Sequence, residues 1–483
     1  MKPSFYITTP IYYVNDLPHL GHAYSTLVAD VMARAERLAR GASSVFFLTG
    51  TDEHGAKIAE KATAAGLSPQ AFADLNAEKF KSAWAALNIQ YDDFIRTTEN
   101  RHSEAVIKIM GRLRAAQTPA GRDVLYQADY EGLYCVGCEK FLTAKDIVDG
   151  KCPLHDREPE LVKEKNWFFR LRDYLPALEE KINNGSLVIY PEERKNETLG
   201  LFKQGLEDFS VSRQKVKWGI PVPWDQEQVI YVWLEALMNY ITGIGYPEDK
   251  KKFSQWWPAN IQILGPDILK FHAIYWPVML LALDLPLPEK LYVHGYFTVD
   301  GKKMSKSLGN AIDPIALTEK YGADAARYLI LSQFAFGFES DIKVTDFDQR
   351  YTAQLVNGLS NLVARLTNLA EKHLPVDIKI ELVQDESQGK VLNLIQAAKF
   401  KEALDFCWQI ISQCDQELEQ TKPWEMAKEN PQQAAEILIK LLGQLRLVGA
   451  LLEPLMPQTS QIITNIFSAD SIKRPANIFN RLT

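Results

Sequence analysis

A strand–helix–strand pattern at the start of the chain limits the possible folds most strongly. Residues 5–10 (FYITTP) read as a β-rich strand that ends at Pro10, and residues 44–50 (SVFFLTG) as a buried strand that stops at Gly50. The segment between them has apolar residues at helical spacing, namely Leu27, Val31, Ala35 and Leu38. Gly41 then follows as a helix C-cap. This order predicts a βαβ unit and therefore a parallel sheet.

The sheet pattern is interrupted and then resumes. From about residue 120 to 230, Gly, Pro, Cys and charged residues are frequent and periodicity is poor, which indicates an insertion. Residues 260–267 then predict a strand, 268–285 a helix, and 290–304 a strand with an Asp300-Gly301 turn. After about residue 346 the strands stop. Three amphipathic helical segments follow and predict a C-terminal bundle: 349–373, 389–420 and 431–455.

Composition excludes several classes of protein. With 46% hydrophobic and 24% charged residues, the chain is neither disordered nor fibrous. A net charge of −7 argues against a broad surface that coats nucleic acid. The most apolar stretch is interrupted by Asp284 and is too short to span a bilayer, and the first residues do not resemble a secretory signal. We therefore expect a soluble cytoplasmic protein that does not bind membranes.

The first motif that indicates a chemical function is PHLGHAYS, residues 18–25. His19 and His22 flank Gly21 between the first strand and its helix. In open α/β sheets, ligands bind beyond the carboxyl ends of strands, where helix N-termini present N–H groups to phosphate. Gly21 lets a nucleotide approach the backbone, and the two imidazoles can donate to phosphoryl oxygens. These residues alone also allow a plain helix start with two surface histidines.

The second signal is DGKKMSKSLGN, which places Lys302, Lys303 and Lys306 on a Gly-flanked loop after a strand. Lysines there suit a pyrophosphate leaving group, because each supplies a compact positive charge. The alternative is a solvated basic hairpin.

The third signal is a set of metal-ligand residues. Cys135 and Cys138 are followed, after thirteen intervening residues, by Cys152 and, three positions on, by His155. Two such pairs predict a closed, structural Zn²⁺ site. The metal would fold an insertion too small and polar to be stable alone. The two other cysteines, Cys407 and Cys414, read as core residues of a helix.

The pair HLGH and KMSKS resembles the double signature of class I aminoacyl-tRNA synthetases; Leu20 replaces the family's isoleucine. TPIYYVND, GTDEHG, YVWLEALMNY and GPDILKFH, in this order, resemble the methionyl-tRNA synthetase family, and NGLSNLVAR and KPW extend the match to the helical part. The single knuckle resembles members with one zinc ion.

The resemblance implies an α/β fold: a Rossmann-like parallel-sheet catalytic domain with an inserted zinc-knuckle module, followed by a C-terminal α-helical bundle. The expected domains are 1–118 and 226–325 (the two catalytic halves), 119–225 (the insertion), 326–347 (a stem-contact segment) and 348–483 (the anticodon-binding domain).

The resemblance also implies an activity with ATP, Mg²⁺, L-methionine and tRNA(Met), both initiator and elongator. His19, Gly21, His22 and Lys306 would bind ATP, and His19, His22, Lys303 and Lys306 would be catalytic. The methionine site would comprise Ile11, Tyr13, Asp52, Trp233, Leu237, Tyr240, Ile268 and His272, with Asp52 on the ammonium group. Asn361, Arg365 and Trp424 would read the anticodon, and Glu235 stands where many relatives have Asp. We expect a monomer.

Several alternatives stay open. On periodicity alone Trp233 could be a helix-core residue, and without the resemblance Asn361 and Arg365 would be ordinary surface residues. A synthetase for Leu, Ile or Val would need a larger insertion than the chain offers between its signatures, and a Cys enzyme would need an open zinc site. A catalytically inactive RNA-binding relative would have no physical reason to keep His19, His22 and Lys306 together.

Overall fold

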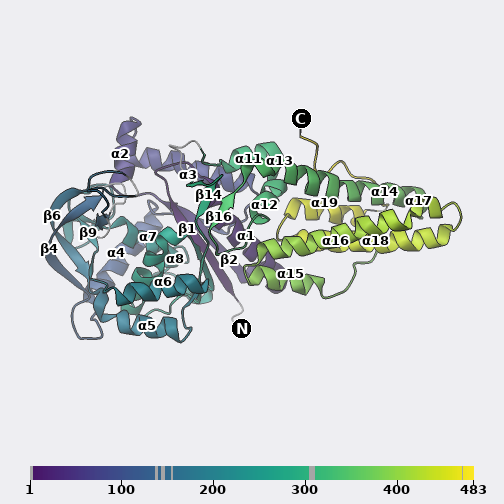
Figure 1. Ribbon diagram of the computed structural model, residues 1–483. Helices are drawn as coiled ribbons and strands as arrows, with labels where there is room; N and C mark the ends of the chain where they lie inside the picture. Colours follow the sequence, from purple (N-terminus) through teal and green to yellow (C-terminus); the bar gives the residue numbers. More distant parts are fainter. Residues whose placement is uncertain are drawn as a thin grey trace. The chain divides into compact units, whose positions relative to one another are not determined.

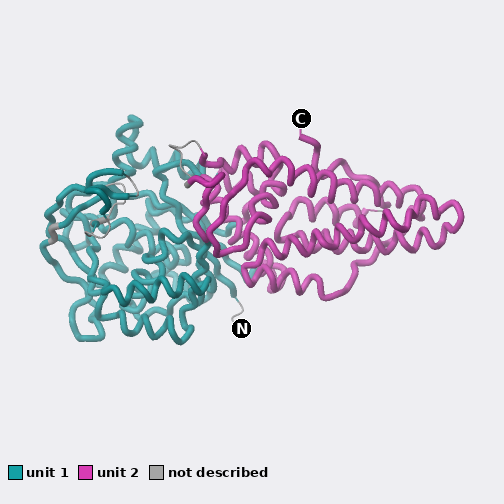
Figure 2. Tube along the Cα trace, viewed as in Figure 1, with its two compact units in different colours: residues 1–18, 43–81, 91–294 teal, residues 19–42, 82–90, 295–483 magenta. Residues whose placement is uncertain are grey.

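The computed structural model describes residues 4–135, 140–142, 147–153, 156–303, 310–469 and 471–482. The chain forms two compact units (Figure 2). Unit 1 comprises Met1–Pro18, Ser43–Lys81 and Tyr91–His294. Unit 2 comprises His19–Ala42, Ser82–Gln90 and Gly295–Thr483.

Unit 1 contains a six-stranded sheet in the order β3-β2-β1-β12-β13-β7, and its neighbouring strands pair in parallel. Figure 1 labels two of its strands, β1 and β2. Its strands are β1 (Phe5–Tyr13), β2 (Val45–Asp52), β3 (Asp93–Arg96), β7 (Val188–Tyr190), β12 (Ile261–Leu264) and β13 (Lys290–Val293). In the sequence, α1 (Leu20–Arg40) lies between β1 and β2, and Gly41 caps it. The predicted parallel sheet and first helix are therefore confirmed.

Two predicted strand ends were wrong. β1 continues past Pro10 because the pairing with β2 shifts between Thr8 and Ile11, and a bulge tolerates a residue without an N–H. β2 continues past Gly50 because this glycine serves a close approach instead of a turn. A Cβ at Gly50 would lie 2.0 Å from the carbonyl oxygen of Ile95 on β3.

The predicted insertion is more ordered than its composition indicated. It forms an antiparallel sheet in the order β5-β4-β6-β8 and a smaller one in the order β10-β11-β9. Their strands are β4 (Leu125–Cys135), β5 (Lys140–Leu142), β6 (Glu160–Phe169), β8 (Phe209–Ser210), β9 (Ser212–Arg213), β10 (Pro221–Val222) and β11 (Asp225–Ile230). β7 also comes from residues 119–225, yet it forms an edge of the parallel sheet, so this range is not one separate block.

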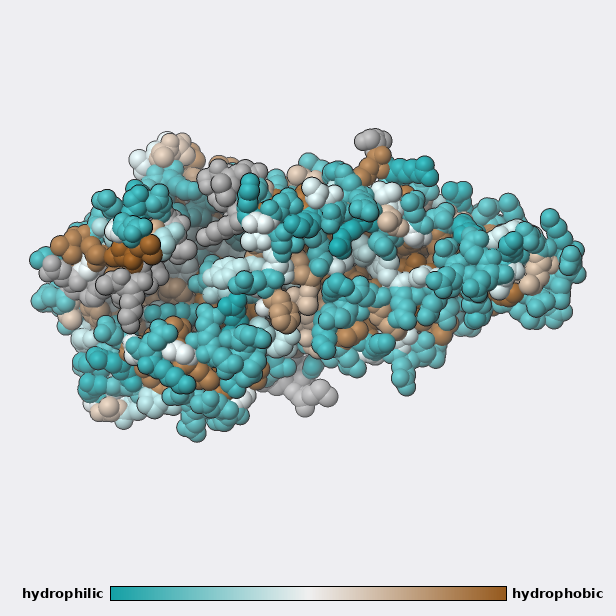
Figure 3. Space-filling view, viewed as in Figure 1, coloured by the Kyte–Doolittle hydropathy of each residue, from teal (hydrophilic) through white to brown (hydrophobic). Residues whose placement is uncertain are grey.

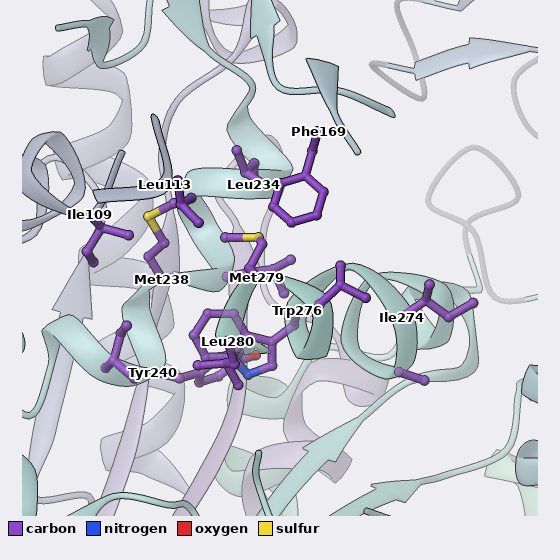
Figure 4. Close-up of a cluster of buried hydrophobic side chains, with 14 of the residues drawn as sticks. Ile109, Leu113, Phe169, Leu234, Met238, Tyr240, Ile274, Trp276, Met279 and Leu280 are labelled. Atoms are coloured by element: carbon purple, nitrogen blue, oxygen red, sulfur yellow. The ribbon is translucent and has the colours of Figure 1, made fainter. Parts of the chain in front are cut away.

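Helices and one large apolar cluster complete unit 1. The helices of unit 1 include α2 (Ala56–Ala64), α4 (Asn100–Ala115), α5 (Leu175–Asn183), α6 (Glu192–Lys203), α7 (Val232–Leu237), α8 (Asn239–Thr242), α9 (Lys250–Trp256), the 3₁₀ turn η4 (Pro266–Ile268), the π-helical turn η5 (Phe271–Tyr275) and α10 (Trp276–Ala282). α3 spans Pro69–Ala86. Figure 4 shows part of the core, where Trp276, Leu280 and Tyr240 lie together.

The predicted strand 290–304 is two strands in different sheets. β13 ends at Val293, and β14 (Phe297–Val299) pairs with β15 (Lys302–Lys303) and β16 (Ser340–Ile342) in unit 2. Gly295 permits the close packing there, since a Cβ would lie 1.9 Å from the carbonyl oxygen of Phe338.

Unit 2 is mainly helical after β16, as predicted. The helices α11 (Pro314–Tyr321) and α12 (Ala323–Leu331) precede β16. The helices that follow it include α13 (Phe347–Arg350), the π-helical η7 (Tyr351–Ser360), α14 (Asn361–His373), α15 (Ser387–Gln396), α16 (Phe400–Thr421), α17 (Pro423–Met426), α18 (Pro431–Leu452) and α19 (Pro457–Ser468). The predicted helix 389–420 is broken at Ala398, whose φ is 58°, and α19 was not predicted.

Within the described ranges, no helix has the length and apolarity needed to cross a membrane. Hydrophilic side chains cover most of the visible face of the helical part (Figure 3).

Candidate active site

The predicted methionine residues all lie in unit 1. Trp233, Leu237 and Tyr240 are on α7 and α8, whereas the others lie at or beyond the carboxyl ends of the adjacent parallel strands β2, β1 and β12. Ile11 and Tyr13 are at the end of β1, and Asp52 ends β2, where it is opposite Tyr13. Ile268 is in the turn that follows β12. Ligands of open α/β sheets bind in this position.

A hydrogen-bonded relay links two buried polar groups of this set, Tyr240 and His272. The Nδ1 of His272 lies 3.0 Å from the carbonyl oxygen of Ile268, and its Nε2 lies 2.7 Å from the Tyr240 hydroxyl. Because a carbonyl only accepts, Nδ1 carries the proton, so Nε2 accepts from the Tyr240 hydroxyl. Burial lowers the pKa of His272 to about 4, although the Ile268 carbonyl acts against this. The imidazole is therefore neutral at pH 7.

Two aromatic rings on α7 and η5, Trp233 and Phe271, form what we call the aromatic wall. The rings of Trp233 on α7 and Phe271 on η5 stack with centroids 4.6 Å apart and planes 17° apart. Trp233 is only partly buried, whereas Leu237 is 4% exposed. The sequence did not single out Phe271, and its place next to His272 in an otherwise apolar helix gave no signal of function.

His19 and His22 cap the start of α1 in unit 2. The Nδ1 of His19 accepts from the Gly21 N–H at 3.1 Å, and the Nδ1 of His22 accepts from the His19 N–H at 3.3 Å. Their rings stack with centroids 3.7 Å apart. Since both Nδ1 atoms accept, each ring carries its proton on Nε2 and is held as a donor.

The hairpin that leads into KMSKS is anchored at its base. An Asp341 carboxylate oxygen accepts from the Gly301 N–H at 2.7 Å and from the Thr298 hydroxyl at 2.8 Å. The backbone of Lys303 pairs with Thr298 in this hairpin, whereas Lys306 lies outside the described residues.

Two of the four predicted zinc ligands are described, and they belong to one cluster. Cys135 and Cys152 are 2% and 1% exposed and pack with Leu142 and Ile147. Cys138 and His155 lie outside the described residues. Within the part of the chain that the structure describes, no group of three or more metal-binding side chains is found.

The predicted anticodon residues lie on the helices of unit 2. The Arg365 guanidinium lies 5.8 Å from the ring centre of Trp424 and forms ion pairs with Asp415 and Glu419 at 3.1 and 2.6 Å. Asn361 begins α14 and is exposed.

Sequence reasoning missed a buried cluster beside the methionine residues. Glu235 on α7 is fully buried between His54 and His102, each 2.8 Å from one of its carboxylate oxygens. The charged residue within YVWLEALMNY, among apolar neighbours, was the available signal. Burial alone would raise the pKa of Glu235, but the two imidazoles lower it below its usual value.

Comparison with known proteins gives the class first. The family model "tRNA synthetases class I (M)" matches residues 5–158 and 143–367. The model "Anticodon binding domain of methionyl tRNA ligase" matches residues 367–483. The two matches fit the parallel sheet and the helical part of the fold.

Comparison with individual relatives supports the same class of protein. The chain is 41% identical over 473 residues to a methionine–tRNA ligase of Caldanaerobacter subterraneus subsp. tengcongensis, covering 95% of this chain and 73% of the relative. It is 39% identical over 481 residues to that of Nostoc sp., covering 96% and 89%. The structure of Mycobacterium tuberculosis methionyl-tRNA synthetase in complex with methionyl-adenylate matches with a TM-score of 0.90 at 33% identity, over 100% of both chains. The chain belongs to the methionyl-tRNA synthetase family.

Proposed function

We propose that this chain activates L-methionine with ATP to form methionyl-adenylate and pyrophosphate, and then transfers the methionyl group to the 3′-terminal adenosine of tRNA(Met). The observation that carries this is the presence in unit 1 of both the Tyr240–His272 relay and the Trp233–Phe271 stack, of which His272 and Phe271 follow the parallel strand β12. An unbranched thioether needs such an aromatic wall, where sulfur–ring contacts contribute about 0.3–1.5 kcal/mol each.

In this proposal each unit contributes its own residues. Asp52 accepts from the substrate ammonium group, and the remaining predicted pocket residues surround the side chain. The neutral Tyr240–His272 pair adds a polar edge without a buried charge. One methylene discriminates by only about 1–3 kcal/mol, so homocysteine is an imperfectly rejected competitor.

The residues that bind the phosphate groups of ATP in this proposal are His19, Gly21, His22, Lys303 and Lys306. The Nε2–H groups of the two histidines donate to phosphoryl oxygens, and the lysines offset the charge of departing pyrophosphate. Mg²⁺ bound with ATP neutralises part of the phosphate charge. Catalysis is then positioning and charge stabilisation, with no covalent enzyme intermediate.

The helical part, residues 348–483, binds the anticodon of initiator and elongator tRNA(Met). Single-stranded bases are read by stacking and polar edge contacts. Trp424 supplies a ring, and Arg365 and Asn361 supply donors. The segment 326–347 contacts the tRNA stem, 1–118 with 226–325 carries catalysis, and 119–225 carries the zinc module. A cytoplasmic monomer completes the proposal.

The residues of the insertion fit one structural Zn²⁺. Cys135 and Cys152 come from different segments yet share one small cluster, and thiolates are preferred zinc ligands. With Cys138 and His155 they would complete a tetrahedral set.

We expect metal analysis to find about one zinc per chain, and we expect Cys135→Ser to lose it. The matched control is Cys407→Ser, which removes a buried thiol of α16 and should keep the zinc. Full zinc content in the Cys135 variant would contradict the assignment.

The activity is tested by amino-acid-dependent ATP–pyrophosphate exchange with Mg²⁺ and each of the twenty amino acids. We expect exchange with methionine well above all others. Exchange with a different amino acid would overturn the pocket assignment, and no exchange would overturn the activity.

A further inference from the structure

A buried carboxylate joins the two parts of unit 1 that carry the methionine residues. Glu235 lies on α7 between Trp233 and Leu237, and its side chain is completely buried. One carboxylate oxygen is 2.8 Å from the Nδ1 of His54, and the other is 2.8 Å from the Nε2 of His102. Since an ionised carboxylate only accepts, both facing imidazole nitrogens carry protons.

His54 connects this carboxylate to Asp52. It follows Asp52 by two residues in the loop after β2 and is 7% exposed. The same loop is fastened on both sides of His54. The Arg96 guanidinium donates twice to Glu53, at 2.7 and 2.9 Å, and the Gly55 N–H donates to the carbonyl oxygen of Trp218 at 3.0 Å.

His102 connects the carboxylate to the helix that carries Tyr240. Its Nδ1 lies 2.8 Å from the hydroxyl of Thr242 on α8, and the ring is fully buried on α4. Glu235 therefore holds together the end of β2, α4, and the α7–α8 segment. Burying a charge in this way is stabilising only when both oxygens have partners, as they do here.

We propose that Glu235 is a positioning residue for methionine binding: through His54 it fixes the Asp52 carboxylate relative to Tyr240 and to the aromatic wall that Trp233 and Phe271 form. This inference rests on the proposed function. Glu235 does not touch the substrate. Its effect is confined to ligands that use Asp52, because Tyr240 and the wall are also held by the Tyr240–His272 relay and the Trp233–Phe271 stack. A displacement of a positioned group by about 1 Å can lower a reaction rate by up to about 100-fold.

The test compares two ligands in Glu235→Gln. Methionine carries the ammonium group, and 4-(methylthio)butanoate has the same side chain without it. The glutamine has nearly the same shape, but its NH₂ group opposes one of the two imidazole N–H groups. We expect calorimetry to show methionine binding weakened at least about ten-fold, and binding of the desamino ligand changed less than about three-fold.

Two further variants separate positioning from folding. Glu235→Asp keeps the charge but reaches one imidazole at a time, so it should recover part of the methionine affinity. Glu164→Gln removes another buried carboxylate of unit 1, which accepts from Asn166 and from the Lys215 N–H, and should leave both ligands unaffected. Equal weakening of both ligands in Glu235→Gln, or no weakening of either, would overturn the inference. Failure of the unaltered protein to bind methionine would instead overturn the proposed function.

Discussion

Replacing Lys306 with alanine should slow methionine-dependent ATP–pyrophosphate exchange by about 10²–10³-fold, the usual cost of removing one group that stabilises transition-state charge. Pyrophosphate gains negative charge only as it departs. An ammonium group that meets this charge acts on the rate and little on methionine, whose predicted residues all lie in unit 1. The dissociation constant for methionine should therefore stay within about two-fold, as calorimetry would show.

The anchoring of the hairpin gives this prediction a physical basis. Asp341 holds both Gly301 and Thr298, and Lys343 in turn pairs with Asp341, so the strands that lead into KMSKS have a fixed base. Lys203→Ala is the matched control, since it removes an exposed lysine of unit 1 and should leave the exchange unchanged. An exchange rate in the Lys306 variant close to that of the original protein would refute the role given to KMSKS.

Local pattern predicted the fold where the relevant partners are close in sequence. The apolar spacing of α1 and its Gly41 cap are local, and both were predicted from the sequence. Gly50 was interpreted as a stop because a glycine that makes room for the Ile95 carbonyl looks the same in sequence as one that makes a turn. The break at Ala398 had no Gly or Pro to announce it.

The candidate site divides in the same way. Residues in short motifs, such as His19 and His22, could be predicted as site residues from sequence because their spacing is itself the signal. The ring of Phe271 and the Glu235 cluster could not, because their meaning depends on contacts between distant segments; His102 and Glu235 are 133 positions apart. The family resemblance implied the predicted pocket positions, but it carried no information on what holds those residues in place.

Substitution of Arg327 by methionine should lower the unfolding free energy of unit 2 by about 3–5 kcal/mol, the cost of breaking a buried ion pair. Arg327 on α12 is fully buried, and its Nη1 lies 2.7 Å from an Asp30 carboxylate oxygen on α1. Its guanidinium also donates to the carbonyl oxygens of Leu87, Pro454 and Leu455 at 3.2, 3.0 and 2.8 Å. Methionine fills similar space but leaves all three carbonyls without this donor.

Because Arg34 also pairs with Asp30, the loss of unfolding free energy in Arg327→Met comes partly from the lost charge and partly from the carbonyls left without a donor. The Nε of Arg34 lies 2.8 Å from Asp30, so the Asp30 carboxylate keeps one cation in Arg327→Met, whereas the carbonyls of residues 87, 454 and 455 lose their donor. Arg327→Lys keeps a positive charge near Asp30, but a lysine lacks the planar guanidinium that donates to three carbonyls. This variant should therefore recover only a minor part of the lost unfolding free energy. Lys440→Met, which breaks an exposed pair with Glu417, should cost less than about 1 kcal/mol. Hydrogen exchange of the α1 and α12 amides measures each variant; protection in Arg327→Met equal to that in Lys440→Met would mean that this buried arginine contributes no more than a surface pair.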